Sequence, residues 1–151
     1  MHEAIERKFP SFFDNFTLPI GKSDISITAY RACPTDKIEA ASFLPTYMEG
    51  VKADLDMADP GTYSLSVSEK PKDIKRFAVM NKAFGKPLRI AKGTTAPCCG
   101  PVQRTRDRTG DKRDGSHIDW WLYDKALPHE HFTIIDDFER YYSEYQKEAP
   151  V

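Results

Sequence analysis

The sequence predicts an α+β fold: one domain over residues 1–151, with a small mixed or antiparallel sheet and short helices. Segments with the two-residue alternation of strands are interleaved with segments that have helical spacing, a pattern typical of this class. The strand segments are short, and the sequence contains no internal repeat that would indicate a repeat architecture.

Composition and length are those of a folded protein of one-domain size. The 151 residues are 40% hydrophobic and 12% aromatic, enough to bury an ordinary core without disulfides or metal. No window approaches about eighteen uncharged apolar residues, and the N-terminal MHEAIERKFP lacks the apolar stretch of a signal peptide. Three cysteines, an odd number, argue against a secreted disulfide framework. We therefore expect a cytoplasmic protein without a membrane span.

The N-terminal part is expected to contain short helices around one strand. Phenylalanines and prolines in the first twenty residues predict one or two short helices that cap the core. Residues 24–33, DISITAYRAC, alternate as a strand does, with Arg31 on the side of the isoleucines. The spacing of Asp36 and Glu39 then predicts a capped short helix that ends near Pro45.

A strand, a cap and a helix are expected in succession after these elements. Residues 62–68, TYSLSVS, alternate larger side chains with serines, so Ser64, Ser66 and Ser68 should line one face. Ser68 is also a candidate cap for a helix that extends to Phe84, because glycine and proline follow as stop signals.

The C-terminal part is expected to hold three strands, a long loop and a final helix. The strands are predicted at 88–91, 117–124 and 131–136, and the helix at 136–148. The helix should bury an aromatic stripe formed by Phe138, Tyr141, Tyr142 and Tyr145. Residues 92–116 have almost no apolar periodicity and are predicted to form a long basic loop, which in a small domain is usually functional or disordered.

The net charge of −1 is unevenly distributed along the chain. Residues 86–113 carry eight lysines or arginines against two aspartates, a net charge of +6, which leaves −7 for the rest. A local basic segment on an acidic body favours an anionic ligand or partner, and duplex nucleic acid is not expected. We expect Lys92, Thr94 and Arg104 to contact phosphate oxygens of a nucleotide.

The glycines of this basic loop suggest a close approach of backbone to a ligand. The pattern at Gly93 is not a Walker phosphate loop, because its lysine precedes the glycine and no earlier glycine stands at the required distance. Gly93 and Gly100 are therefore expected only to let the backbone come near a bound anion.

Five residues in the C-terminal part could ligate zinc, but their spacing does not fit a zinc motif. These residues are Cys98, Cys99, His117, His129 and His131. Adjacent cysteines lack the separation found in common zinc motifs, and His129-Glu130-His131 is not the His-Glu-x-x-His pair of a helix. No metal is therefore expected.

Residues 117–124, HIDWWLYD, place several polar and aromatic side chains on one strand face. His117 and Asp119 point the same way, beside Trp121 and Tyr123, and are candidate catalytic residues in a cleft. The adjacent serine does not complete a nucleophile elbow, since the sequence has no Gly-x-Ser-x-Gly.

The segments AYRAC and YSLSVSEK, about thirty residues apart, together resemble two steps of the mono-ADP-ribosyltransferases. This resemblance implies an NAD-dependent transferase in which Arg31 contacts the NAD phosphate or ribose and Ser64 and Ser66 shape the nicotinamide pocket. The family's catalytic glutamate step is matched only by Gln146-Lys147-Glu148, which lies in the predicted terminal helix. Glu148 is the candidate catalytic residue on this basis.

Three hypotheses for function follow from these patterns. The first is a nucleotide-binding protein, related in activity to the ADP-ribosyltransferases, with Trp121 or Tyr123 stacking on a ring of the bound NAD or nucleotide. The second is a non-enzymatic interaction or inhibitor module of the kind carried by mobile elements, which predicts no small-molecule cleft and a loop that orders only on binding. The third is single-stranded nucleic-acid binding, with one of the two tryptophans as a stacking platform.

Overall fold

The computed structural model describes residues 8–19, 21–33, 37–45, 48, 56–76 and 89–148. The strands are β1 (Thr28–Cys33), β2 (Leu65–Ser68), β3 (Arg89–Thr94), β4 (Val102–Arg104), β5 (His117–Trp120) and β6 (Phe132–Ile134). The helices are η1 (Ser11–Asn15), η2 (Ala40–Ser42), η3 (Pro60–Tyr63), α3 (Thr105–Thr109), η4 (Lys112–Asp114), η5 (Pro128–His131) and α4 (Phe138–Glu148), where η marks a 3-10 helix.

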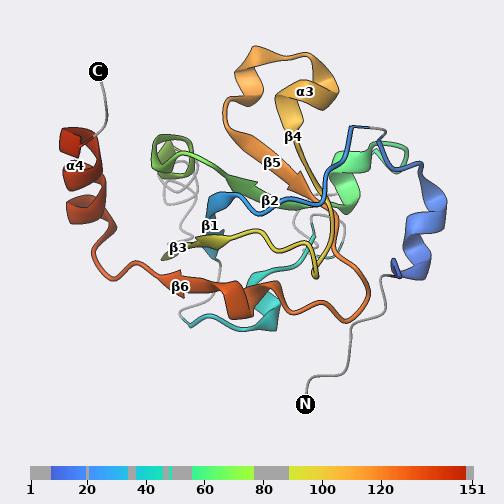
Figure 1. Ribbon diagram of the computed structural model, residues 1–151, viewed down its shortest axis with the longest axis horizontal. Coiled ribbons are helices and arrows are strands. Elements are labelled where there is room, and N and C mark those ends of the chain that lie inside the picture. The colour runs from blue at the N-terminus through green and yellow to red at the C-terminus, as the bar shows by residue number, and fades with distance from the viewer. Residues whose placement is uncertain are drawn as a thin grey trace.

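The six strands form one sheet in the order β4-β5-β2-β1-β3-β6, with every pair antiparallel (Figure 1). The α+β prediction is confirmed, and of the two sheet types allowed by the sequence the antiparallel one is observed. In the described part of the chain, no helix has the length and hydropathy needed to span a bilayer.

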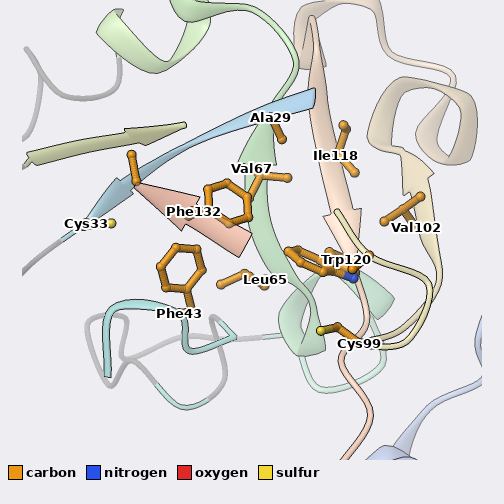
Figure 2. Close-up of a cluster of buried hydrophobic side chains, with 12 residues drawn as sticks. Ala29, Cys33, Phe43, Leu65, Val67, Cys99, Val102, Ile118, Trp120 and Phe132 are labelled. Atoms are coloured by element: carbon orange, nitrogen blue, oxygen red, sulfur yellow. The ribbon is translucent and has the colours of Figure 1, made fainter. Parts of the chain in front are cut away.

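Residue alternation gives the sheet two faces, of which one carries the main hydrophobic cluster. We call it the core face; its side chains include Ala29, Leu65, Val67, Val102, Ile118, Trp120 and Phe132 (Figure 2). Phe43, which follows η2, covers this face and packs on Phe132 with ring centroids 5.0 Å apart. Each fully buried valine, leucine, isoleucine or phenylalanine of the cluster stabilises the fold by about 2 kcal/mol, because its apolar surface is removed from water.

The opposite face, which we call the helical face, is covered by helices. Tyr30 and Ile90 pack there against Ile74, which lies in the helical residues 71–76, and against Tyr141 of α4. The short helix α3 packs against β4 and β5. Figure 1 shows α3 and α4 far apart, near opposite edges of the sheet.

The prediction of a long loop at 92–116 is wrong. β3 continues to Thr94, and the later residues form β4, α3 and η4 in succession. β4 was missed because an edge strand is held by backbone hydrogen bonds, here to β5, and needs no apolar alternation of its own. α3 is too short to display a helical period; its end is marked by Gly110, which has the left-handed φ of 74°.

The predicted strand 117–124 is half as long as expected. β5 ends at Trp120, after which the amide of Trp121 bonds to Pro101 O and that of Tyr123 bonds to Cys99 O. These two bonds hold the chain against the turn before β4 without continuing the sheet. The alternation of faces predicted for residues beyond Trp120 therefore does not apply.

The helices in the N-terminal part are shorter and tighter than predicted. The first twenty residues contain the 3-10 helix η1, and Glu39 and Ser42 form the capping box of η2 in place of the predicted Asp36, which lies outside the described residues. The first two residues of the predicted strand 62–68 belong to η3. Residues 71–76 are helical as predicted, and the expected continuation to Phe84 lies outside the described residues.

The aromatic stripe of α4 is only partly covered. Phe138, Tyr141 and Tyr142 are half-buried, whereas Tyr145 is 38% exposed. The prediction of a buried stripe is therefore correct for the first half of the helix, where Tyr141 and Phe138 meet the helical face.

Candidate functional site

Arg31 is a buried structural residue on the core face of the sheet. Its side chain lies between Ala29 and Cys33 of the core cluster, and the residue is 5% exposed. The guanidinium donates from Nε to Ser42 O at 3.1 Å and from Nη1 to Ser66 O at 3.0 Å. Through these two hydrogen bonds to backbone carbonyls, the Arg31 side chain connects η2 to β2.

The serine hydroxyls lie on the other side of the sheet. Ser66 is paired with Asp119 across the β2–β5 ladder, and paired residues share a face, the one from which Ser64 Oγ donates to Asp119 Oδ1 at 2.9 Å. Arg31 reaches the Ser66 carbonyl from the core face. The predicted pocket in which Arg31, Ser64 and Ser66 face one ligand is therefore not formed, because strand alternation places the guanidinium and the hydroxyls on opposite faces.

The two predicted catalytic residues of β5 are held by partners from α3. Asp119 is 1% exposed and accepts from Arg108 Nε at 2.8 Å, while Nη1 of the same arginine donates to Asp59 at 3.0 Å. His117 Nδ1 contacts the hydroxyl of Thr105. Burial lowers the pKa of His117, and this outweighs the opposite effect of the nearby Asp119 carboxylate. α3 therefore covers both residues with a hydrogen-bonded network.

The aromatic residues predicted to stack on a ligand ring belong to the core. Trp121 is fully buried, packs with Phe13 and Tyr63, and donates from Nε1 to Pro60 O at 2.9 Å. Trp120 is also fully buried, so neither tryptophan offers the exposed platform that single-strand binding requires. Tyr123 is 8% exposed and lines a cavity described below.

The residues predicted to hold phosphate do not share a site. Lys92 Nζ lies on the helical face, 5.3 Å from the ring centroid of Tyr141, and Thr94 is exposed at the end of β3. Arg104 is bound through Nε and Nη2 to the carboxylate of Glu69. Glu148 is the last residue of α4, at the end of a helix that packs on a different part of the sheet.

Both glycines predicted to approach a ligand approach the protein's own backbone. A Cβ on Gly93 would stand 2.1 Å from His131 O, where β3 pairs with β6. A Cβ on Gly100 would stand 1.8 Å from Trp121 O. The close approach at these two glycines is therefore to another strand or turn of the same chain, and their predicted approach to a bound anion stays a prediction.

Three arginines of the basic segment are neutralised by ion pairs. Arg104 pairs with Glu69, Arg108 with Asp59 and Asp119, and Arg113 with Asp111. Three of the acidic partners, Glu69, Asp59 and Asp119, lie outside residues 86–113. Acidic residues from other parts of the chain therefore neutralise part of the positive charge of this segment. Arg106 and Lys112 are exposed, and neither is in an ion pair with another described residue.

A cavity of about 240 Å³ lies between η1, η2 and the segment after β5. We call it the aromatic cavity; its lining includes Phe12, Phe13, Phe43, Tyr63, Tyr123, Leu122, Ala126 and His129. Nδ1 of His129 is buried and has no hydrogen-bond partner among the described residues. Lys125, also in the lining, adopts a φ of 64°, which is uncommon for a residue with a side chain and recurs at ligand sites.

A second cavity, about 230 Å³ in volume, lies beside the edge strand β4. We call it the edge cavity; it is lined by Gly21, Ser23, Ile25, Ile27, Val102, Gln103, Arg104 and Asp107. Oε1 of Gln103 is buried without a hydrogen-bond partner in the described part of the chain. The edge cavity thus combines apolar walls with an amide, an arginine and an aspartate.

Three of the five possible zinc ligands meet in space. The ligand atoms of Cys98, Cys99 and His131 all lie within 4.8 Å of one another, whereas His117 contacts Thr105 and His129 lines the aromatic cavity. Burial raises the pKa of Cys99 to about 12, and the neighbouring Cys98 adds to this, while the backbone N–H of Leu127 acts in the opposite direction.

Sequence reasoning did not find the aromatic cavity. Its lining comes from segments far apart in the chain. Of the lining residues, only Tyr123 and His129 are candidate ligand-binding residues in the sequence, Tyr123 for ring stacking and His129 for zinc. The phenylalanines of the first twenty residues were a usable signal, because a cap rich in aromatic side chains can also form the wall of a pocket. Comparisons of the chain with protein-family models, with curated proteins and with solved structures found no match.

Proposed function

We propose that the protein binds a small planar organic molecule in the aromatic cavity. The observation that carries this proposal is that His129, whose buried Nδ1 has no hydrogen-bond partner among the described residues, belongs to the lining of a cavity whose other walls are mainly aromatic and aliphatic. Such an atom costs about 1–3 kcal/mol when it is left unsatisfied. A ligand with an apolar ring and one hydrogen-bonding group would satisfy the imidazole nitrogen and fill the cavity at once.

The volume restricts the ligand to a single ring system. Pockets for drug-sized ligands are roughly 300–1,000 Å³, and the aromatic cavity has about 240 Å³. A whole dinucleotide such as NAD is therefore too large, but a nicotinamide, adenine or indole ring is of suitable size. Asp124 and Lys125 in the lining are exposed and would contact any polar substituent that reaches solvent.

We expect at least one of three ring compounds, nicotinamide, adenine and indole, to raise the melting temperature of the protein. A ligand at about ten times its dissociation constant stabilises the folded state by about 1.4 kcal/mol, which corresponds to about 4 °C for a chain of this length. His129→Leu should weaken binding about tenfold, because one hydrogen bond of about 1 kcal/mol is lost. Ala126→Phe should abolish it by filling the cavity.

The matched control is His131→Gln, which changes a neighbouring exposed histidine outside the aromatic cavity. This variant should bind the ring compound as the unmodified protein does. The proposal is wrong if none of the three compounds shifts the melting temperature, or if Ala126→Phe remains folded and binds with unchanged affinity.

A second candidate function is binding of a phosphate-bearing nucleotide with only its base in the edge cavity and the rest of the molecule outside, because about 230 Å³ is too small for a whole nucleotide. The unpaired Oε1 of Gln103 is suited to accept from the exocyclic amine of a base, and Arg104 lies in the same lining. Arg104 would have to exchange Glu69 for a phosphate, which a half-exposed arginine can do at modest cost. ADP-ribosyltransferase activity stays a prediction from the resemblance alone.

Titration with ATP, NAD and ADP-ribose tests this second candidate. At least one nucleotide should raise the melting temperature, and both Gln103→Leu and Arg104→Gln should reduce the shift. Gln146→Leu, which changes an exposed glutamine on α4, is the control and should leave the shift intact. A shift that survives both substitutions would place the nucleotide elsewhere. No response to any of the three compounds would remove the hypothesis and favour the interaction-module alternative.

A further inference from the structure

The group formed by Cys98, Cys99 and His131 has dimensions close to those of a zinc site. A tetrahedral zinc ion with bonds of about 2.3 Å to sulfur and about 2.0 Å to nitrogen sets its ligand atoms roughly 3.5–3.8 Å apart. The two sulfurs are 4.0 Å apart, and all three ligand atoms lie within 4.8 Å. Cys98 and His131 are exposed, so their side chains have room to rotate toward an ion.

The backbone that carries the two cysteines is held in a turn. The amide of Cys99 donates to Ala96 O at 2.9 Å, and Cys99 O accepts from the amide of Tyr123 at 2.8 Å. The next residue, Gly100, accepts from Trp120 Nε1 at 3.0 Å. The turn therefore presents both thiols from a fixed position beside the core.

The third ligand comes from a segment about thirty residues later in the chain. His131 ends η5, and its carbonyl lies so close to Gly93 that a side chain there would collide with it. This contact sets the distance between η5 and the end of β3, from which the chain continues to the cysteines. The two adjacent cysteines do not match a zinc motif in the sequence, and their local spacing does not indicate a third ligand. The fold brings His131 to them.

The donor atoms and the exposure of the group suit a zinc ion. Cys98 and His131 are exposed, so that an ion can enter from solvent. Two sulfurs and one imidazole favour zinc over calcium or magnesium, which prefer oxygen ligands.

We propose that Cys98, Cys99 and His131 bind a zinc ion, with two thiolates, one imidazole and a fourth position open to water. Binding would release the two thiol protons to solvent, and the ion would connect the turn before β4 to η5. Three protein ligands and one water form the pattern of zinc sites that keep a position open for a further ligand. This site does not depend on the ligand of the aromatic cavity.

The test is titration of the reduced, metal-free protein with Co²⁺ and then with Zn²⁺. Co²⁺ should give thiolate-to-metal charge-transfer absorption and tetrahedral d–d bands that saturate at one equivalent, and Zn²⁺ should abolish both. His131→Gln and Cys98→Ser should each weaken Zn²⁺ binding by about 100-fold, the upper end of the losses seen when even a supporting residue is removed. A non-thiol reductant keeps the two cysteines from oxidising during the titration.

His129→Gln is the matched control, since it removes the neighbouring imidazole that is not in the group. It should retain Zn²⁺ affinity, and circular dichroism should show the unmodified fold in all three variants. The proposal is overturned if no cobalt–thiolate absorption develops, or if His131→Gln and His129→Gln bind Zn²⁺ equally well. Because His129→Leu affects ring binding and His131→Gln affects metal binding, failure of one proposal can be told from failure of the other.

Discussion

Arg108→Ala is expected to lower the free energy of unfolding by about 3 kcal/mol, the low end of the cost of breaking a buried ion pair. Asp119, the partner carboxylate, is 1% exposed, and without the guanidinium it would keep one side-chain donor among the described residues, Ser64 Oγ. The low end applies because the arginine side chain is 15% exposed and water can partly replace it from the Asp59 side.

Arg113→Ala is the matched control for this prediction. Arg113 also pairs with an aspartate in the basic segment, but its side chain is 91% exposed. Exposed pairs contribute about 0–1 kcal/mol, so this variant should be nearly as stable as the unmodified protein. Urea unfolding followed by circular dichroism measures both; equal losses in the two variants would show that the pair between Arg108 and Asp119 has no special role.

A double-mutant cycle separates the pair from the cost of each residue. Asp119→Ala alone should destabilise by a similar amount, since Arg108 then lacks its buried partner. The double variant should lose clearly less than the sum of the two single losses, because removal of both charges leaves no buried ion unpaired. Additive losses would contradict a direct interaction.

Gly100→Ala is expected to have the second large effect, a loss of at least about 3 kcal/mol or failure to fold. The new Cβ would stand 1.8 Å from the carbonyl oxygen of Trp121, and that atom belongs to the backbone, so no side-chain rotation relieves the contact. The φ of 143° adds strain for any residue with a side chain. The melting temperature should fall by about 10 °C if the variant folds.

Gly110→Ala provides the comparison that separates collision from backbone strain. Gly110 also has a positive φ, 74°, but a Cβ there meets no atom within 4 Å. Its replacement should cost about 1 kcal/mol, the ordinary penalty of a left-handed alanine. If Gly100→Ala costs no more than Gly110→Ala, the chain near Trp121 is less constrained than the structure indicates.

Local patterns were sufficient to predict the class of the fold and most of its strands. The alternation in 24–33, 62–68 and 117–124 identified β1, β2 and β5, although each strand proved shorter than its pattern. Alternation indicates which side chains can be buried, but a strand ends where its backbone no longer pairs with a neighbouring strand. The neighbouring strand belongs to another segment of the chain. β5 ends at Trp120, and the amide of the next residue, Trp121, bonds to Pro101 O in the turn before β4.

The residue types that the fold needs can be read from the chain alone: alternating apolar side chains, glycines at close approaches, and aspartates and arginines that can pair. Their partners are known only from the folded molecule. Gly93 accommodates the carbonyl of His131, and Arg108 neutralises Asp59, which lies 49 residues away along the chain. Contacts of this kind depend on the order of strands in the sheet, which no local spacing contains, and they also brought together the candidate site around His129 that the sequence did not reveal.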